Sequence, residues 1–165
     1  MGFWGYLVVG RDDRPLPELY ALRPFRSDVA GNRVRADNWQ ICSLRSEASI
    51  PDTVALLVEL CAETHAPVLM VSVLNDDCVS VEGFSQDGYW QACPARHSAA
   101  AGERSGDAAC ATEAAVRAVG WAAAADRRIE ADPIADLLFA PPDRRVDGFF
   151  EELLERLGLE RSTCR

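Results

Sequence analysis

Cys93 and His97 are the residues of this sequence whose types and spacing most directly suggest chemistry. A thiolate becomes a strong nucleophile when a nearby base or cation lowers its pKa. The imidazole of His97 or the guanidinium of Arg96 could do this across a loop. No third residue that would orient the imidazole can be identified, and Pro94 follows Cys93 at the end of an expected strand. We name Cys93 and His97 as catalytic candidates, and we favour a protein that is not an enzyme.

Metal ligation has less support in the same stretch. Cys93, His97 and Cys110 lack the close ligand pairs of a zinc site. The acidic pairs at 12–13 and 76–77 are adjacent residues, whose side chains point apart on an extended chain. No phosphate-binding glycine motif occurs. We therefore expect neither a metal nor a cofactor.

The chain has a net charge of −9, and this charge is unevenly distributed. It contains no lysine, and residues 46–95 contain no arginine either. The eight acidic residues of this block are Glu47, Asp52, Glu59, Glu63, Asp76, Asp77, Glu82 and Asp87.

Such a block disfavours nucleic acid as a partner, because phosphate binding needs a basic footprint. It favours a cationic protein and speeds the encounter with it. The alternative is a solvated face that keeps the protein soluble. If the block is a docking surface, we expect it to consist of Glu47, Asp76, Asp77, Glu82, Asp87 and the aromatic Trp90.

Hydrophobic periodicity predicts an α+β fold in a single domain over residues 1–165. We expect an approximately five-stranded, mostly antiparallel sheet, with one helix between strands and three C-terminal helices packed on it. The predicted strands are 5–10, 37–45, 67–74, 78–84 and 89–93. The predicted helices are 51–67, 107–128, 132–140 and 146–159.

Several positions carry finer expectations. Asp52 is a candidate N-cap for the first helix, and the shared face of Val54, Leu57, Val58 and Cys61 predicts deep burial. In the strand at 78–84, Val79 and Val81 are expected to point inward.

Trp39 and Trp90 are expected to be the most exposed aromatic residues. The alanine-rich helix at 107–128 is expected to pack closely against a neighbour. The stretch at 94–106 is expected to be a polar connector between a strand and a helix.

The N-terminus lacks the basic region of a signal peptide, and no stretch approaches the roughly 20 apolar residues that span a membrane. We expect a cytoplasmic protein with no membrane contact, whose six cysteines are free thiols. The stretches "GFWGYLVVGRDDRPL" and "FFEELLERLGL" resemble small actinobacterial proteins. This resemblance implies lineage and not activity.

These observations predict a non-enzymatic binding protein with an acidic surface, for example an immunity or inhibitor protein that blocks a basic partner. The alternative is a small enzyme or ligand-binding protein with a pocket near the 94–106 connector. A third class is an oligomerisation module built on the alanine-rich helix. The sequence leaves the oligomeric state open.

Overall fold

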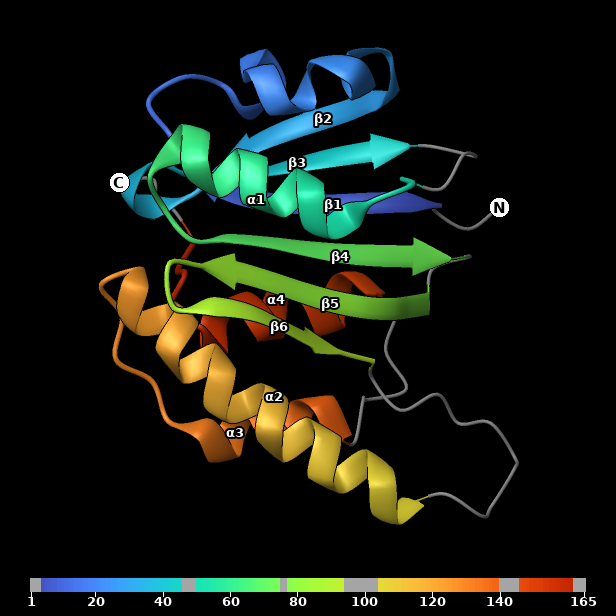
Figure 1. Cartoon of the computed structure of the whole chain (residues 1–165), viewed down its shortest axis with the longest axis vertical. Helices are drawn as coiled ribbons and strands as arrows, with labels where there is room; N and C mark the ends of the chain where they lie inside the picture. Colours follow the sequence, from blue (N-terminus) through green and yellow to red (C-terminus); the bar gives the residue numbers. More distant parts are fainter. Residues whose placement is uncertain (1–3, 46–49, 75–76, 94–103, 140–145, 162–165) are drawn as a thin grey trace.

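The computed structural model describes residues 4–45, 50–74, 77–93, 104–139 and 146–161, with the backbone alone at 77–79 and 104–109. Strands dominate the first half of the chain, and the second half is helical (Figure 1). In chain order the elements are β1 (Gly5–Arg11), the 3-10 segments η1 (Leu16–Glu18) and η2 (Tyr20–Asp28), β2 (Val29–Val34), η3 (Ala36–Asn38), β3 (Trp39–Arg45), α1 (Thr53–Thr64), β4 (Val68–Leu74), β5 (Asp77–Ser85), β6 (Gly88–Ala92), α2 (Arg104–Ala124), α3 (Ala131–Phe139) and α4 (Val146–Arg156).

The strands form one antiparallel sheet in the order β2-β3-β1-β4-β5-β6. The predicted α+β architecture is confirmed, with six strands where about five were expected. The additional strand is β2, whose sequence is VAGNRV. It lies at an edge of the sheet and is at least partly exposed at every position, so no alternation of apolar and polar residues marks it.

α1 connects β3 to β4, which are the two neighbours of β1 in the sheet, so the helix crosses over β1. It begins after Asp52, whose carboxylate accepts a 2.9 Å hydrogen bond from the Ala55 N–H. This confirms the predicted N-cap. β4, β5 and β6 then form an antiparallel meander.

Two apolar clusters lie on opposite faces of the sheet. Alternate side chains of β1, such as Leu7 and Val9, pack against α2, α3 and α4 on one face. Val8 and Met70 belong to the other face, which packs against α1, η1 and η2. The inner strands β1, β3 and β4 therefore alternate between two interiors rather than between an interior and solvent.

Small side chains bring α2 close to the sheet. Ala114, Ala115 and Ala118 are buried, and the indole N–H of Trp121 donates a 2.9 Å hydrogen bond to the carbonyl of Val68. The close packing predicted for this alanine-rich helix is therefore made within the chain.

Trp39 and Trp90 are both buried, so the expectation that they are exposed is wrong. The ring centroids of Trp39 and Trp121 are 5.9 Å apart. Trp90 pairs with Gly83 across β5 and β6. A Cβ atom added to Gly83 would lie only 2.2 Å from the Trp90 indole nitrogen, so the missing side chain makes room for the ring.

Candidate binding surface

α1 is apolar on most of its circumference, although the sheet covers only one side of it. The buried inner side chains are Leu56, Leu57, Leu60 and Cys61. The exposed outer side chains are Val54, Ala55, Val58, Glu59 and Ala62. Val54 and Val58 are 39% and 41% exposed, so the expectation that they are deeply buried is wrong. A helix that is apolar all round is normally enclosed, so this outer side is suited to a partner.

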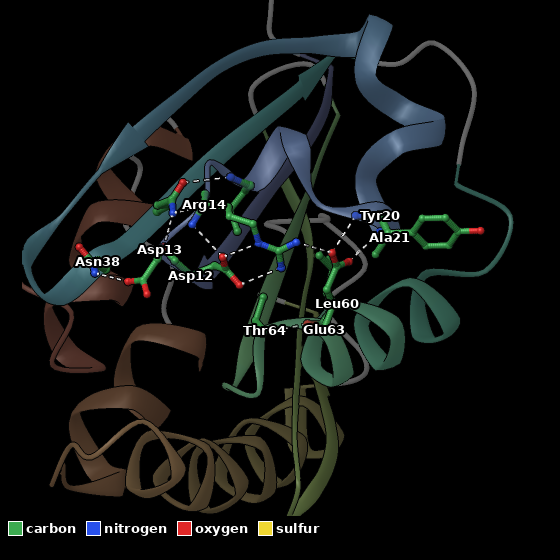
Figure 2. Close-up of polar contacts among 11 residues, drawn as sticks. Asp12, Asp13, Arg14, Tyr20, Ala21, Asn38, Leu60, Glu63 and Thr64 are labelled. Carbon is green, nitrogen blue, oxygen red and sulfur yellow. Dashed lines mark hydrogen bonds and ion pairs between the residues drawn. The ribbon is translucent and has the colours of Figure 1, made fainter.

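The flank of α1 that carries Glu63 faces η2. The Glu63 carboxylate accepts hydrogen bonds from the backbone N–H groups of Tyr20 (2.9 Å) and Ala21 (3.0 Å), as Figure 2 shows. At about 100° per residue, Val54 lies on the opposite side of the helix from Glu63. Val54 and its neighbour Val58 therefore face away from η2, toward β5 and β6.

A buried carboxylate confirms that α1 begins over these strands. Oε1 of Glu82, on β5, accepts hydrogen bonds from the hydroxyls of Thr53 (2.8 Å) and Tyr89 (2.8 Å). Glu82 is only 4% exposed. In the part of the chain that the structure describes, no arginine or histidine forms an ion pair with it. This corrects its expected place on an open acidic surface.

Trp90 cannot belong to an open surface either, because it is buried on the other face of the sheet, toward α2. Its neighbour Tyr89 has the opposite orientation and, with Phe84, is partly buried against the α1-side cluster. Gln91 shares the face of Tyr89 and is exposed.

On this side of the sheet, the described elements that pack over the strands are η1, η2 and α1 (Figure 1). The helix that packs against β6 is α2, which lies on the opposite face. We use the name β5–β6 face for the surface made by Val54, Val58, Phe84, Tyr89 and Gln91.

Carboxylates lie at both ends of the β5–β6 face. Asp52 is exposed at the N-terminus of α1. Asp87 is exposed in the turn between β5 and β6, near the end of the sheet where α1 terminates. Neither carboxylate forms an ion pair with another described residue, and the same holds for Glu59 on the outer side of α1.

The other predicted acidic positions contribute less. Glu47 and Asp76 lie outside the described residues, and for Asp77 only the backbone at the start of β5 is described. Glu63 is paired with Arg14 at 3.4 Å. Burial raises the pKa of Glu63. The hydrogen bonds from Tyr20 and Ala21, together with the nearby Arg14, lower the pKa by more than burial raises it, so the net pKa lies below the ordinary value.

The contacts around Arg14 hold the chain after β1 in place (Figure 2). Arg14 also binds Asp12, with its Nε 3.1 Å from Oδ1. The buried Gln40 amide donates to the carbonyls of Asp12 and Arg14 at 2.8 and 2.9 Å, and it accepts from Leu16 and Asn32. This network fixes η1 and η2 beside α1. Among the described residues, no group of three or more His, Cys, Asp or Glu could hold a metal ion.

Cys93 is exposed immediately after β6, and His97 lies outside the described residues. A cavity of about 320 Å³ lies between β6 and α2. Arg117 lines it and donates hydrogen bonds to the Tyr89 carbonyl (3.3 Å) and to Glu113 (3.2 Å). The cavity is lined by Tyr89, Trp90, Gln91, Cys110, Glu113, Ala114 and Arg117.

The 94–106 connector, beside which the sequence analysis expected a pocket, lies mostly outside the described residues, and sequence reasoning missed the charged pair of this cavity. The spacing of Glu113 and Arg117, four residues apart on a helix, is the available signal. It also missed Val54 and Val58 as surface residues. The sequence indicates this because α1 contains more apolar residues than fit on the one side of the helix that the sheet buries.

No family model matches this chain, and neither the curated proteins nor the solved structures contain a significant match. The described helices include none with the length and apolarity needed to cross a membrane.

Proposed function

We propose that this chain is a cytoplasmic binding protein that holds a basic protein partner on its β5–β6 face and acts by binding rather than by catalysis. An immunity or inhibitor protein is one form of this function. The carboxylates of Asp52 and Asp87 attract the partner's cations, and the flank of Val54 and Val58 supplies the apolar contact.

The observation that carries this proposal is the exposed apolar flank of α1 beside carboxylates that form no ion pair with any arginine the structure describes. Val54 and Val58 expose apolar surface that the fold does not use. Glu82 adds a nearly enclosed carboxylate that accepts hydrogen bonds from two hydroxyls and forms no ion pair with another described residue. A cationic partner would compensate that charge, because a buried charge is costly unless it is paired.

The same charges disfavour other partners. A net charge of −9 repels the phosphates of nucleic acid and the headgroups of anionic lipids. It speeds the encounter with a basic protein and makes the association rate fall with salt.

Site-specific photo-crosslinking in cells tests this proposal. A photoreactive amino acid at Val58 is expected to capture a protein with a basic isoelectric point, and capture should weaken as salt is raised in lysates. The control places the same amino acid at Val116, which is 59% exposed on α2. No adduct at Val58, identical adducts at both positions or an acidic captured protein would contradict the proposal.

A second candidate function is favoured by the cavity between β6 and α2. A small ligand there would contact Cys110, Glu113 and Arg117. A thermal-shift screen of small molecules, followed by iodoacetamide labelling, tests it. A genuine ligand is expected to protect the thiol of Cys110 and to leave Cys93 reactive. Stabilising compounds that protect neither thiol would count against the cavity as their site.

A further inference from the structure

We infer that the partner contributes an amphipathic, basic α-helix that lies beside α1 over β5 and β6. This inference rests on the proposed function and goes beyond it, because it states which structural element docks and where. It begins from an asymmetry between the two faces of the sheet.

One face of the sheet carries α2, α3 and α4, whereas the other carries α1 with the short segments η1 and η2. η2 occupies one flank of α1, through the hydrogen bonds to Glu63. The opposite flank presents the exposed Val54 and Val58, and the strands on that side of α1 carry the partly buried Phe84 and Tyr89. A sheet face is normally covered by packed helices, so a helix along this flank would extend the layer.

The dimensions and side chains suit a helix. α1 has 12 residues, so this flank is about 18 Å long, or slightly more than three turns. Val54 and Val58 are four residues apart and form one ridge of α1, which packs into a groove of a neighbouring helix. The partner helix would carry apolar side chains at positions i, i+4 and i+7 on the side that meets this ridge.

The positions of the carboxylates define where the partner's cations lie. Asp52 and Asp87 at the two ends of the face require a lysine or arginine near each end of the docked helix. Glu82 lies between them, buried beneath Thr53 and Tyr89, and its charge attracts a cation on the docked helix through space rather than by direct contact. This arrangement distinguishes an amphipathic basic helix from a merely basic chain.

A second copy of the chain does not fit this description. α1 contains no arginine or lysine, and the outer side that a symmetric α1–α1 contact would use carries Glu59. Two copies, each with a net charge of −9, repel one another as well. The complementary surface must therefore come from a different, positively charged protein.

Fluorescence anisotropy with two synthetic peptides tests the inference. The first peptide is an amphipathic sequence of leucine, alanine and arginine, about 18 residues long because shorter helices are marginal in water. The second has the same composition in an order that destroys the apolar face. We expect saturable binding of the first peptide at low salt, at least about tenfold tighter than that of the second.

Two variants and a control locate the binding. Val58→Arg places a cation on the flank, and Glu82→Gln removes the charge while keeping an oxygen that can accept from Thr53 and Tyr89. Each is expected to weaken peptide binding about tenfold. Val116→Arg, on α2, should change it less than about twofold. Circular dichroism and thermal unfolding verify that each variant is folded.

The outcomes separate this inference from the proposed function. Equal binding of both peptides, or binding that Val58→Arg leaves unchanged, overturns the docked helix. If neither peptide binds while Val58 crosslinks a basic protein, the proposed function stands and the helical mode is wrong. If Val58 captures no basic protein, the proposed function fails, and this inference fails with it.

Discussion

The hydroxyl of Tyr89 donates a 2.8 Å hydrogen bond to Oε1 of Glu82, and this contact couples the edge strand β6 to a buried carboxylate. Thr53 donates to the same oxygen from the first turn of α1. A carboxylate that accepts two hydroxyl hydrogen bonds is partly compensated for its loss of water. The Tyr89–Glu82 hydrogen bond therefore stabilises the fold at the β5–β6 face, which is the surface where we place the partner.

Replacing Tyr89 with Phe should lower the free energy of unfolding by about 1 to 2 kcal/mol at neutral pH, because the hydrogen bond to a charged acceptor is lost. The matched control is Tyr20→Phe, since Tyr20 is 72% exposed. Urea denaturation followed by circular dichroism measures both. Equal effects of the two substitutions would show that the Tyr89 hydroxyl contributes nothing specific.

The ionisation of Tyr89 should also make the protein less stable at alkaline pH. Burial raises the pKa of the Tyr89 phenol above its ordinary value, and the hydrogen bond to Glu82 and the charge of Glu82 raise it further. Because the folded state holds the phenol proton more tightly than the unfolded state, the stability that Tyr89 contributes is fully present below the unfolded-state pKa of about 10. This stability is lost as the pH rises above that value toward the folded-state pKa. The free energy of unfolding should therefore fall above about pH 10, and less steeply in Tyr89→Phe. An unchanged slope in that variant would exclude Tyr89 as its source.

Gly83→Ala should destabilise the fold by about 2 kcal/mol or more, because the new Cβ collides with the Trp90 indole in a packed interior. Gly31→Ala on β2 is the control, since a Cβ there meets nothing within 4 Å. It should change stability by less than about 1 kcal/mol. Tryptophan fluorescence during urea unfolding reports both, and similar midpoints would contradict the tight packing of Trp90 on Gly83.

Local patterns were sufficient where one interaction dominates. The apolar run at 67–74 predicted the central strand β4, which is buried at most positions. The helix predicted at 146–159 corresponds to α4, whose buried side chains include Phe149, Phe150, Leu153 and Leu154 at helical spacing. Gly158 ends that helical segment with φ of 81°, as expected for a glycine C-cap.

The errors in the strands have one physical origin, which is that the sheet is covered on both faces. In β5, the alternation of residues predicts Val81 in the interior and therefore its neighbour Glu82 in solvent. Both are buried, because the second face of the sheet lies under α1. Trp90 was misplaced for a related reason, since the space above Gly83 depends on a cross-strand pair that no local pattern reveals. In α1, Val54 and Val58 could not be told from Leu57, because apolar residues surround the helix.

An ion pair between Arg35 and Glu151 holds the C-terminal segment against the rest of the fold. Protonation of Glu151 should therefore make the protein less stable at acid pH. Arg35, 6% exposed, donates to Glu151 at 2.9 Å and, through its other nitrogens, to the carbonyl of Leu159. Burial raises the pKa of Glu151, but the hydrogen bonds and charges of Arg35 and Arg161 outweigh it, so the net pKa is lowered. The stability that this carboxylate contributes is present above its unfolded value of about 4.3 and is lost as the pH falls through the lower folded value.

Glu151→Gln should therefore lower the free energy of unfolding by about 1 to 3 kcal/mol at pH 7 and reduce its decline below about pH 4. The control is Glu155→Gln, an exposed position on the same helix, expected to change stability by less than about 0.5 kcal/mol. Urea unfolding at a series of pH values measures both variants. An acid decline as steep as that of the unmodified protein would exclude Glu151 as a principal cause.

The four cysteines whose side chains the structure describes should fall into two classes of reactivity, because alkylation requires both access and a thiolate. Cys93 and Cys110 are exposed, whereas Cys42 and Cys61 are buried. Burial raises the pKa of the Cys42 thiol to about 11 and also raises that of Cys61. At pH 8, iodoacetamide should modify Cys93 and Cys110 at least about tenfold faster than Cys42, because access and thiolate fraction act in the same direction.

Isotope-coded iodoacetamide measures these rates. The folded protein is labelled briefly with the light reagent, then unfolded and labelled to completion with the heavy reagent, and peptide mass spectrometry gives the rate at each cysteine. In urea the two classes should converge, since the burial that separates them is lost on unfolding. Native labelling of Cys42 at the rate of Cys93 would mean that β3 opens readily to solvent, which the enclosed position of Cys42 between β1 and β2 excludes.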